Sequence, residues 1–225
     1  MELPIQPICQ GQTNGCGTAA LAMALNCLAG TAAPQITQAM LDRGHREMDS
    51  FCAPHMLIRA ARKHGFQGQL YNRATLSEII AHLDAQRPLL SLHSTNGTIT
   101  GLHYVLVAGY QKSETGADTQ LILWDPAPRC NQRKVIGYQE FVKRFWQPFT
   151  VFGIPTGLER TMIVLSRIGN LPPIRDVPRN VPRALHAAFQ LNRLLNTLSV
   201  ILAPLKKIGG GSNARGTPPD GTGLQ

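Results

Sequence analysis

The first part of the chain carries hydrophobic patterns that predict helices. Residues 16–29, CGTAALAMALNCLA, are rich in Ala, Leu and Met, which have high helix propensity. Because this stretch is apolar on nearly every side, we expect the helix to be buried. Shorter helices are predicted over 35–43 and 54–64, and another over 75–86, which opens with a capping-box pattern.

Beyond Pro88 the pattern changes to short apolar segments bounded by Gly, Asn and Asp. Three of them, LLSLH, GLHYVLVAGYQ and TQLILWD, predict strands, with a hairpin loop over 114–118 between the last two. A short helix is predicted over 138–146, and further strands over 149–154 and 160–168. Helices therefore precede an antiparallel sheet, which indicates an α+β fold with a cleft between a helical half and a sheet half.

The C-terminal quarter of the chain differs in composition from the rest. We interpret residues 169–182, with four prolines, as a linker, residues 183–207 as a basic amphipathic helix and residues 208–225 as a disordered tail. Residues 1–168 then form one folded domain. Of the net charge of +9, +6 falls in residues 159–225. This end is the part expected to contact an anionic surface, nucleic acid or a partner protein, with a solvated tail as the alternative.

The cysteine pattern and the N-terminal sequence indicate the compartment in which the protein is made. Five cysteines are scattered without a CxxC pair, so we expect no structural metal, and no cofactor is required. Their odd number and wide spacing also argue against a disulfide framework and favour a reducing compartment. The N-terminus lacks the features of a secretory signal, and no apolar stretch is long enough to span a membrane. We therefore expect a soluble chain made in the cytoplasm, with export by a non-classical secretion system left open.

Cys16 stands where the first helix should begin. The N–H groups and the dipole at a helix N-terminus favour a thiolate, which is the nucleophilic form of cysteine. Gly15 and Gly17 leave little bulk around the sulfur, so a substrate backbone can approach. A side-chain amide from Gln10 or Gln12 could donate to an oxyanion together with the backbone N–H of Cys16. Cysteine is also common as a small buried hydrophobe, so position alone does not decide its role.

His103 opens one predicted strand, and Asp125 ends the next. Neighbouring strands can bring two such side chains together across a sheet. An Asp that accepts a hydrogen bond from one ring nitrogen fixes the histidine tautomer and leaves the other nitrogen for the thiol. Asp125 before Pro126 also fits a simple turn, and spacing alone leaves both interpretations open. His93 is the nearest rival base, but its place before a Ser-Thr-Asn-Gly loop predicts ordinary surface polarity.

The stretch QGQTNGCGTAALAM, followed by GLHYVLVAGY and LILWDPA, resembles the double-glycine leader peptidases over about residues 4–168. These papain-like cysteine peptidases are best known as N-terminal domains of bacteriocin-exporting ABC transporters. The resemblance implies cleavage after Gly-Gly in protein or peptide substrates, in a cleft narrow enough to admit only glycines. The roles that it implies are nucleophile for Cys16, base for His103, orienting residue for Asp125 and oxyanion donor for Gln10.

Two departures from that family bear on the expected function. Gly15 stands where the family often has Asp, and transporter domains are absent from the sequence. Stand-alone relatives include toxins that secretion systems deliver into competitor cells, and such a toxin would have an immunity or inhibitor protein as a partner. We therefore expect a cysteine endopeptidase acting as a secreted antibacterial toxin. The alternatives are maturation of a bacteriocin-like leader, deamidation or transglutamination by the same triad, and an inactive domain that only binds Gly-Gly segments.

Overall fold

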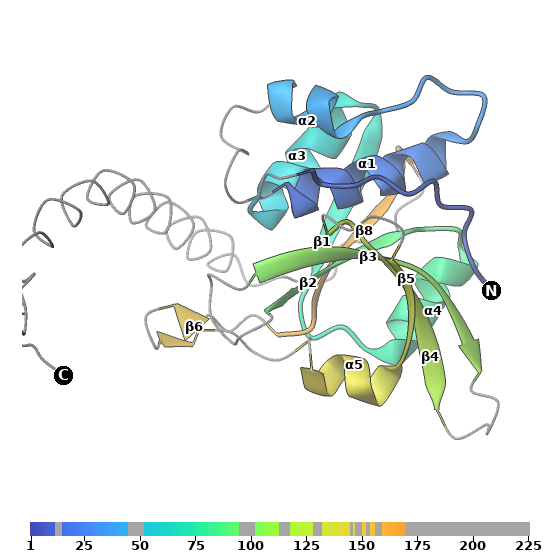
Figure 1. Ribbon diagram of the computed structural model, residues 1–225, viewed down its shortest axis with the longest axis vertical. Coiled ribbons are helices and arrows are strands. Elements are labelled where there is room, and N and C mark those ends of the chain that lie inside the picture. The colour runs from blue at the N-terminus through green and yellow to red at the C-terminus, as the bar shows by residue number, and fades with distance from the viewer. Residues whose placement is uncertain are drawn as a thin grey trace, which may run out of the picture.

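A six-stranded antiparallel sheet with helices on both faces forms the body of the protein (Figure 1). α1, α2 and α3 lie on one side of the sheet, and α4 and α5 lie on the other. The computed structural model describes residues 1–11, 15–44, 52–94, 102–112, 118–127, 132–144, 146, 150–151, 154–155 and 159–169. The linker, basic helix and tail predicted beyond residue 169 lie outside this part, as do Gln12 and most of the predicted 114–118 loop.

The elements have the following bounds. The helices are α1 (Cys16–Ala29), α2 (Gln38–Gly44), α3 (Pro54–Lys63), α4 (Leu76–Asp84) and α5 (Tyr138–Arg144). The strands of the large sheet are β1 (Phe66–Tyr71), β2 (Leu89–Ser94), β3 (Leu102–Lys112), β4 (Thr119–Asp125), β5 (Gln132–Gly137) and β8 (Thr161–Arg167). A second, two-stranded sheet consists of β6 (Thr150–Val151) and β7 (Ile154–Pro155).

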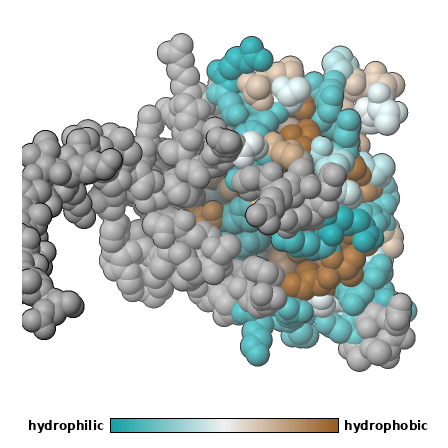
Figure 2. Space-filling model, viewed as in Figure 1, coloured by the Kyte–Doolittle hydropathy of each residue, from teal (hydrophilic) through white to brown (hydrophobic). Residues whose placement is uncertain are grey.

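The strand order of the large sheet is β1-β8-β2-β3-β4-β5, so the last strand in the sequence lies between two early ones. Each neighbouring pair is antiparallel. Every residue of β8 from 161 to 166 is buried, since β8 lies between β1 and β2 in the sheet and α1 and α3 pack against it. On the face shown in Figure 2, apolar surface appears between hydrophilic regions and does not cover the whole face.

The predicted α+β class is confirmed, but the strict order of helices before strands is wrong. β1 lies between α3 and α4, and neither β1 nor β5 was predicted from the sequence. Both are edge strands, with a single neighbour each, and their sequences FQGQLY and QRKVIG are more polar than those of the central strands. The single strand predicted over 149–154 is also wrong, because β6 and β7 pair as two short strands.

α1 is buried over residues 17–25, as its apolar composition predicts. Gly17 permits the close approach of this helix to its neighbours. A Cβ atom at Gly17 would lie 3.0 Å from the Cβ atom of Cys52 and 3.2 Å from Cδ2 of Tyr104 on β3. Tyr104 in turn donates a hydrogen bond of 2.9 Å from its buried hydroxyl to the Cys52 carbonyl. The small size of Gly17 therefore serves packing against the core, in addition to any room that it leaves beside residue 16.

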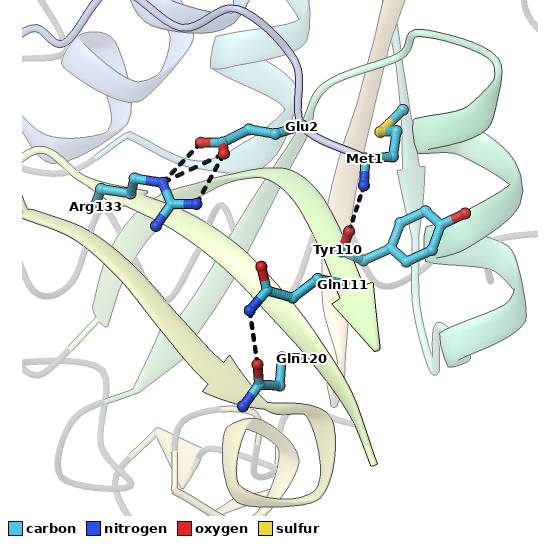
Figure 3. A network of polar contacts seen from close by, with 6 residues as sticks. All are labelled: Met1, Glu2, Tyr110, Gln111, Gln120 and Arg133. Atoms are coloured by element: carbon cyan, nitrogen blue, oxygen red, sulfur yellow. Dashed lines mark hydrogen bonds and ion pairs between the residues drawn. The ribbon is translucent and has the colours of Figure 1, made fainter. Parts of the chain in front are cut away.

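The N-terminal residues pair with the last part of β3. β2 pairs with β3 only as far as Val107, and the N-terminal residues pair with the residues that follow. The Leu3 N–H donates to the Ala108 carbonyl at 2.8 Å, and the Tyr110 N–H donates to the Met1 carbonyl at 2.9 Å. The terminal ammonium of Met1 also donates to the Tyr110 carbonyl at 2.8 Å (Figure 3). A Cβ atom at Gly109 would lie 2.5 Å from the Met1 carbonyl oxygen, so only glycine lets the two backbones approach this closely.

Side chains reinforce this N-terminal pairing. Arg133 of β5 donates from Nε to Glu2 Oε1 at 3.0 Å and from Nη2 to Glu2 Oε2 at 2.8 Å, a two-point contact (Figure 3). Nearby, Gln111 Nε2 donates to Gln120 Oε1 at 2.8 Å across β3 and β4 (Figure 3). The segment that leads from Glu2 to the start of α1 is thus fixed at its beginning.

None of the helices in the described part of the chain has the length and apolar character needed to span a bilayer.

Candidate active site

The N-terminus of α1 meets β3 and β4 at the candidate site. Cys16 is the first residue of α1, and the N-cap, Gly15, has no side chain that could occupy the first N–H groups of the helix. His103 is the second residue of β3, and Asp125 is the last residue of β4. The buried, apolar middle of each element packs in the core and so fixes these terminal positions.

The Asp125 carboxylate is held at both of its oxygens. Oδ1 lies 2.7 Å from Nε2 of His103 and accepts a further hydrogen bond of 3.0 Å from the Ala127 N–H. Oδ2 accepts a hydrogen bond of 2.8 Å from Nζ of Lys134 on β5. The side chains of His103 and Asp125 are 19% and 11% exposed, so the pair is largely shielded from water.

Charges at the site stabilise a protonated His103. Burial would lower the pKa of this imidazole, but its hydrogen bonds with Asp125 and with the Cys16 thiol outweigh burial and raise the pKa to about 9. Burial would likewise raise the pKa of Asp125, yet the hydrogen bonds from His103 and Lys134 hold it well below its usual range. Since Nε2 of His103 faces Asp125, Nδ1 remains for the Cys16 sulfur. Three side chains from separate elements therefore form one connected chain of contacts.

His93 lies beside His103 and is not on the surface, which corrects the prediction from sequence. The two residues are paired in register across β2 and β3, and their rings meet edge to face with centroids 5.4 Å apart. His93 is only 5% exposed. Burial, followed by the positive charge on His103, lowers the pKa of His93 to about 3. His93 is therefore a neutral ring packed against the charged one, and its burial makes it a poor rival base.

We expect acid to destabilise the fold through His93. Its pKa is about 3 in the folded protein against an ordinary value of 6.5, so only the unfolded chain takes up the proton as the pH falls below 6.5. Stability from this group is therefore complete above pH 6.5 and is lost toward pH 3. Between pH 7 and pH 5 the loss is about 2 kcal/mol in the free energy of unfolding. Urea unfolding of the wild type and His93→Phe at pH 7 and pH 5 measures this loss. The free energy of unfolding of the wild type, relative to that of His93→Phe, should fall by about 2 kcal/mol between the two pH values.

The control for that measurement is His64→Phe. His64 is a half-buried residue at the C-cap of α3, so His64→Phe makes the same substitution away from the candidate site. His82 is 6% exposed, and burial and then Arg87 lower its pKa as well. It therefore adds to the loss of stability in acid, by the same amount in the wild type and in both variants. If the difference between wild type and His93→Phe were constant from pH 7 to pH 5, His93 would not be held neutral by the fold.

Gln10 lies next to the His103–Asp125 pair. Its backbone N–H donates to the Pro126 carbonyl at 2.9 Å, and its side chain is half-buried. Through this contact Gln10, one of the two candidate oxyanion donors, lies beside Pro126, the residue that follows Asp125. The other, Gln12, lies outside the described residues.

The cysteines depart from the sequence-based expectation in one respect. Cys9 is disulfide-bonded, whereas no disulfide was predicted. Disulfides depend on contacts in the folded chain, which sequence spacing does not reveal. Cys16, Cys27 and Cys52 are not disulfide-bonded. Burial raises the pKa of Cys27 to about 11, so this thiol, unlike one at the start of a helix, is in an inert environment.

One residue at the site was not singled out from the sequence, namely Lys134, and the burial of the rival base His93 was not foreseen either. Lys134 lies on a strand that the hydrophobic pattern did not predict, so no sequence signal linked it to Asp125. Within the described residues, no group of three or more His, Cys, Asp or Glu side chains could hold a metal ion.

A buried helix that presents a cysteine at its N-terminus to a histidine–aspartate pair on an antiparallel sheet defines a papain-like cysteine peptidase. The model of the Peptidase C39-like family matches residues 2–151, which is most of the described chain, and the protein belongs to this family. It is accordingly a cysteine-type peptidase. No curated protein sequence matches the chain.

Solved structures show the same fold. The peptidase domain of Streptococcus ComA, a bifunctional ABC transporter involved in quorum sensing, is 20% identical with a TM-score of 0.51, and the match covers 73% of this chain and 98% of that one. A C39-like peptidase from Bacillus anthracis is 12% identical with a TM-score of 0.52, over 73% of this chain and 94% of that one. At these identities the likeness concerns the fold.

Proposed function

We propose that Cys16 is the nucleophile of a thiol endopeptidase, with His103 as the proton carrier and Asp125 as the residue that orients His103. The observation that carries this proposal is the unbroken series of contacts from the Cys16 thiol to the His103 ring and on to Asp125 at 2.7 Å. A histidine with its pKa raised to about 9 stays protonated at neutral pH and so stabilises a thiolate beside it.

In the proposed reaction, the Cys16 thiolate attacks the carbonyl carbon of the scissile peptide bond. The carbonyl oxygen becomes an oxyanion, for which the Cys16 N–H and the Gln10 side-chain amide are the proposed donors. Collapse of this intermediate breaks the C–N bond, and protonated His103 gives its proton to the leaving amine. The neutral imidazole then removes a proton from water, which hydrolyses the thioester and restores the free thiol.

We propose Gly-Gly as the site of cleavage, on the basis of the resemblance of the sequence around Cys16, His103 and Asp125 to double-glycine peptidases. The test is a peptide with Leu-Gly-Gly followed by a small residue, with a Leu-Ala-Ala peptide of equal length as the matched control. Mass spectrometry should find one cut, directly after the second glycine, and no cut in the control. A cut in both peptides would refute the specificity, and a mass change or cross-link without a cut would indicate deamidation or transglutamination.

The same resemblance supports a proposed biological setting, in which the peptidase is an antibacterial toxin delivered into competitor cells. Its alternative is maturation of a leader peptide. The two settings differ in the effect of the enzyme within a bacterial cytoplasm. A toxin should arrest growth when the wild type is expressed there and not when Cys16→Ala is expressed. Growth unaffected by the wild type, together with cleavage of a co-expressed double-glycine leader, would favour maturation.

A further inference from the structure

Lys134 reaches the Asp125 carboxylate from the side opposite His103. Nζ lies 2.8 Å from Oδ2, while His103 contacts Oδ1 at 2.7 Å. In the antiparallel pairing of β4 and β5, Asp125 is opposite Gln132, and Lys134 is two residues further along the same face. The lysine head group is partly in water, with 49% of the side chain exposed, whereas Asp125 is 11% exposed. Lys134 is thus a half-exposed cation in contact with a largely buried anion.

We propose that Lys134 is a positioning residue that fixes the Asp125 carboxylate and, through it, the orientation and charge of His103 beside Cys16. This inference rests on the proposed function of those three residues and adds a fourth, from a different strand. Lys134 does not contact the thiol or the scissile bond, so its effect is expected to pass through Asp125.

The orientation of the carboxylate depends on contacts at both oxygens. The Ala127 N–H and His103 share Oδ1, and Lys134 is the side chain that holds Oδ2. Without the contact at Oδ2, the carboxylate can rotate about its terminal torsion, which is a soft one. Rotation would let the carboxylate, with His103 still bonded to it, turn away from the geometry that directs the ring at Cys16. The first expected consequence of losing Lys134 is therefore a lower rate of catalysis.

The second consequence is electrostatic. The groups that face His103 among the described residues are Cys16 from α1, His93 from β2 and Asp125 from β4, with Lys134 from β5 behind Asp125. Of these, Lys134 is the one permanent cation at neutral pH, and its charge opposes the protonation of His103. Removing it should raise the pKa of His103 further above about 9. At the separation set by these contacts, a rise of about 0.5 to 1 pH unit is expected for partly screened charges.

The test compares Lys134→Met, which keeps the length of the side chain but removes its charge, with Lys134→Arg, which keeps the charge. Arg133→Met is the matched control, because Arg133 is next along the same strand, faces the opposite side of the sheet and pairs with Glu2. The His103 ring is titrated by NMR, and kcat/KM on the Leu-Gly-Gly peptide is measured against pH. The NMR titration does not depend on cleavage, so it tests Lys134 even if the proposed substrate is wrong.

We expect the His103 titration and the alkaline limb of kcat/KM to move upward together by about 0.5 to 1 pH unit in Lys134→Met. At pH 7 the activity should fall by about 3- to 10-fold. Lys134→Arg should restore the midpoint, and Arg133→Met should leave it unchanged. An unmoved midpoint in Lys134→Met, or an equal shift in Arg133→Met, would overturn the proposal. Lys134→Gln serves as a second neutral variant, and thermal melts of all variants identify any loss of folding.

Discussion

Replacing Cys16 with alanine should reduce kcat/KM for peptide cleavage by about 10⁴-fold or more, because the proposed nucleophile is then missing. The same change should lower the pKa of His103 from its value of about 9, since the thiol at Cys16 is one of the groups that raises it. A peptide assay and an NMR titration of the histidine ring measure the two effects separately. Together they test the role of Cys16 as nucleophile and its contact with His103.

Cys27→Ala is the matched control for this experiment. Cys27 lies on the same helix, and burial raises the pKa of its thiol to about 11, so it should contribute nothing to cleavage. Its loss should leave kcat/KM within about 2-fold of the wild type. Equal losses in the two variants would mean that activity responds to the packing of α1 and not to the thiol at its first residue.

Replacing Asp125 with asparagine should reduce kcat by about 10²- to 10⁴-fold. The amide keeps the size of the carboxylate but removes the charge that holds His103 protonated, and its NH₂ group can only donate. Whichever way the amide turns, one of the contacts at Oδ1 and Oδ2 is lost, because His103, Ala127 and Lys134 all donate to this side chain. The His103 pKa should accordingly fall, and the pH range of activity should narrow on its alkaline side.

A comparison with Asp84→Asn separates this effect from a general change in surface charge. Asp84 is an exposed carboxylate that accepts a hydrogen bond of 2.9 Å from the Tyr110 hydroxyl, and it is not in contact with the candidate site. Its variant should keep the wild-type pH profile. If Asp125→Asn retained full kcat with an unchanged profile, Asp125 would have only the turn role that its place before Pro126 also allows.

Much of the site could be predicted because its residues lie at the ends of strongly patterned elements. The apolar run after Cys16 indicated a buried helix, and the strands that begin near His103 and end at Asp125 have continuous apolar middles, YVLVA and LIL, that predict buried strands. Two adjacent strands joined by a short loop pair with each other in most folds, so the meeting of His103 and Asp125 followed from local pattern.

The residues that were missed depend on contacts between distant parts of the chain. β1 and β5 are polar edge strands, and without β5 there was no reason to connect Lys134 with Asp125. His93 looked like a surface residue because a polar loop follows it, whereas pairing with β3 buries its ring against His103. The disulfide of Cys9 was missed for the same reason: it joins positions that only the folded chain brings together.

The place of β8 in the sheet has a consequence for the order of events during synthesis. Cys16, His103 and Asp125 all leave the ribosome before β8 does, yet β8 fills the position between β1 and β2. Until residues 161–167 are available, β1 has no partner and β2 has an open edge, so β3 lacks a complete sheet to support it. Pairings between such distant segments also form slowly. A newly made chain is therefore expected to have Cys16 in place before His103 and Asp125 are held beside it. It should become able to cut proteins only when β8 has joined the sheet, at the end of folding.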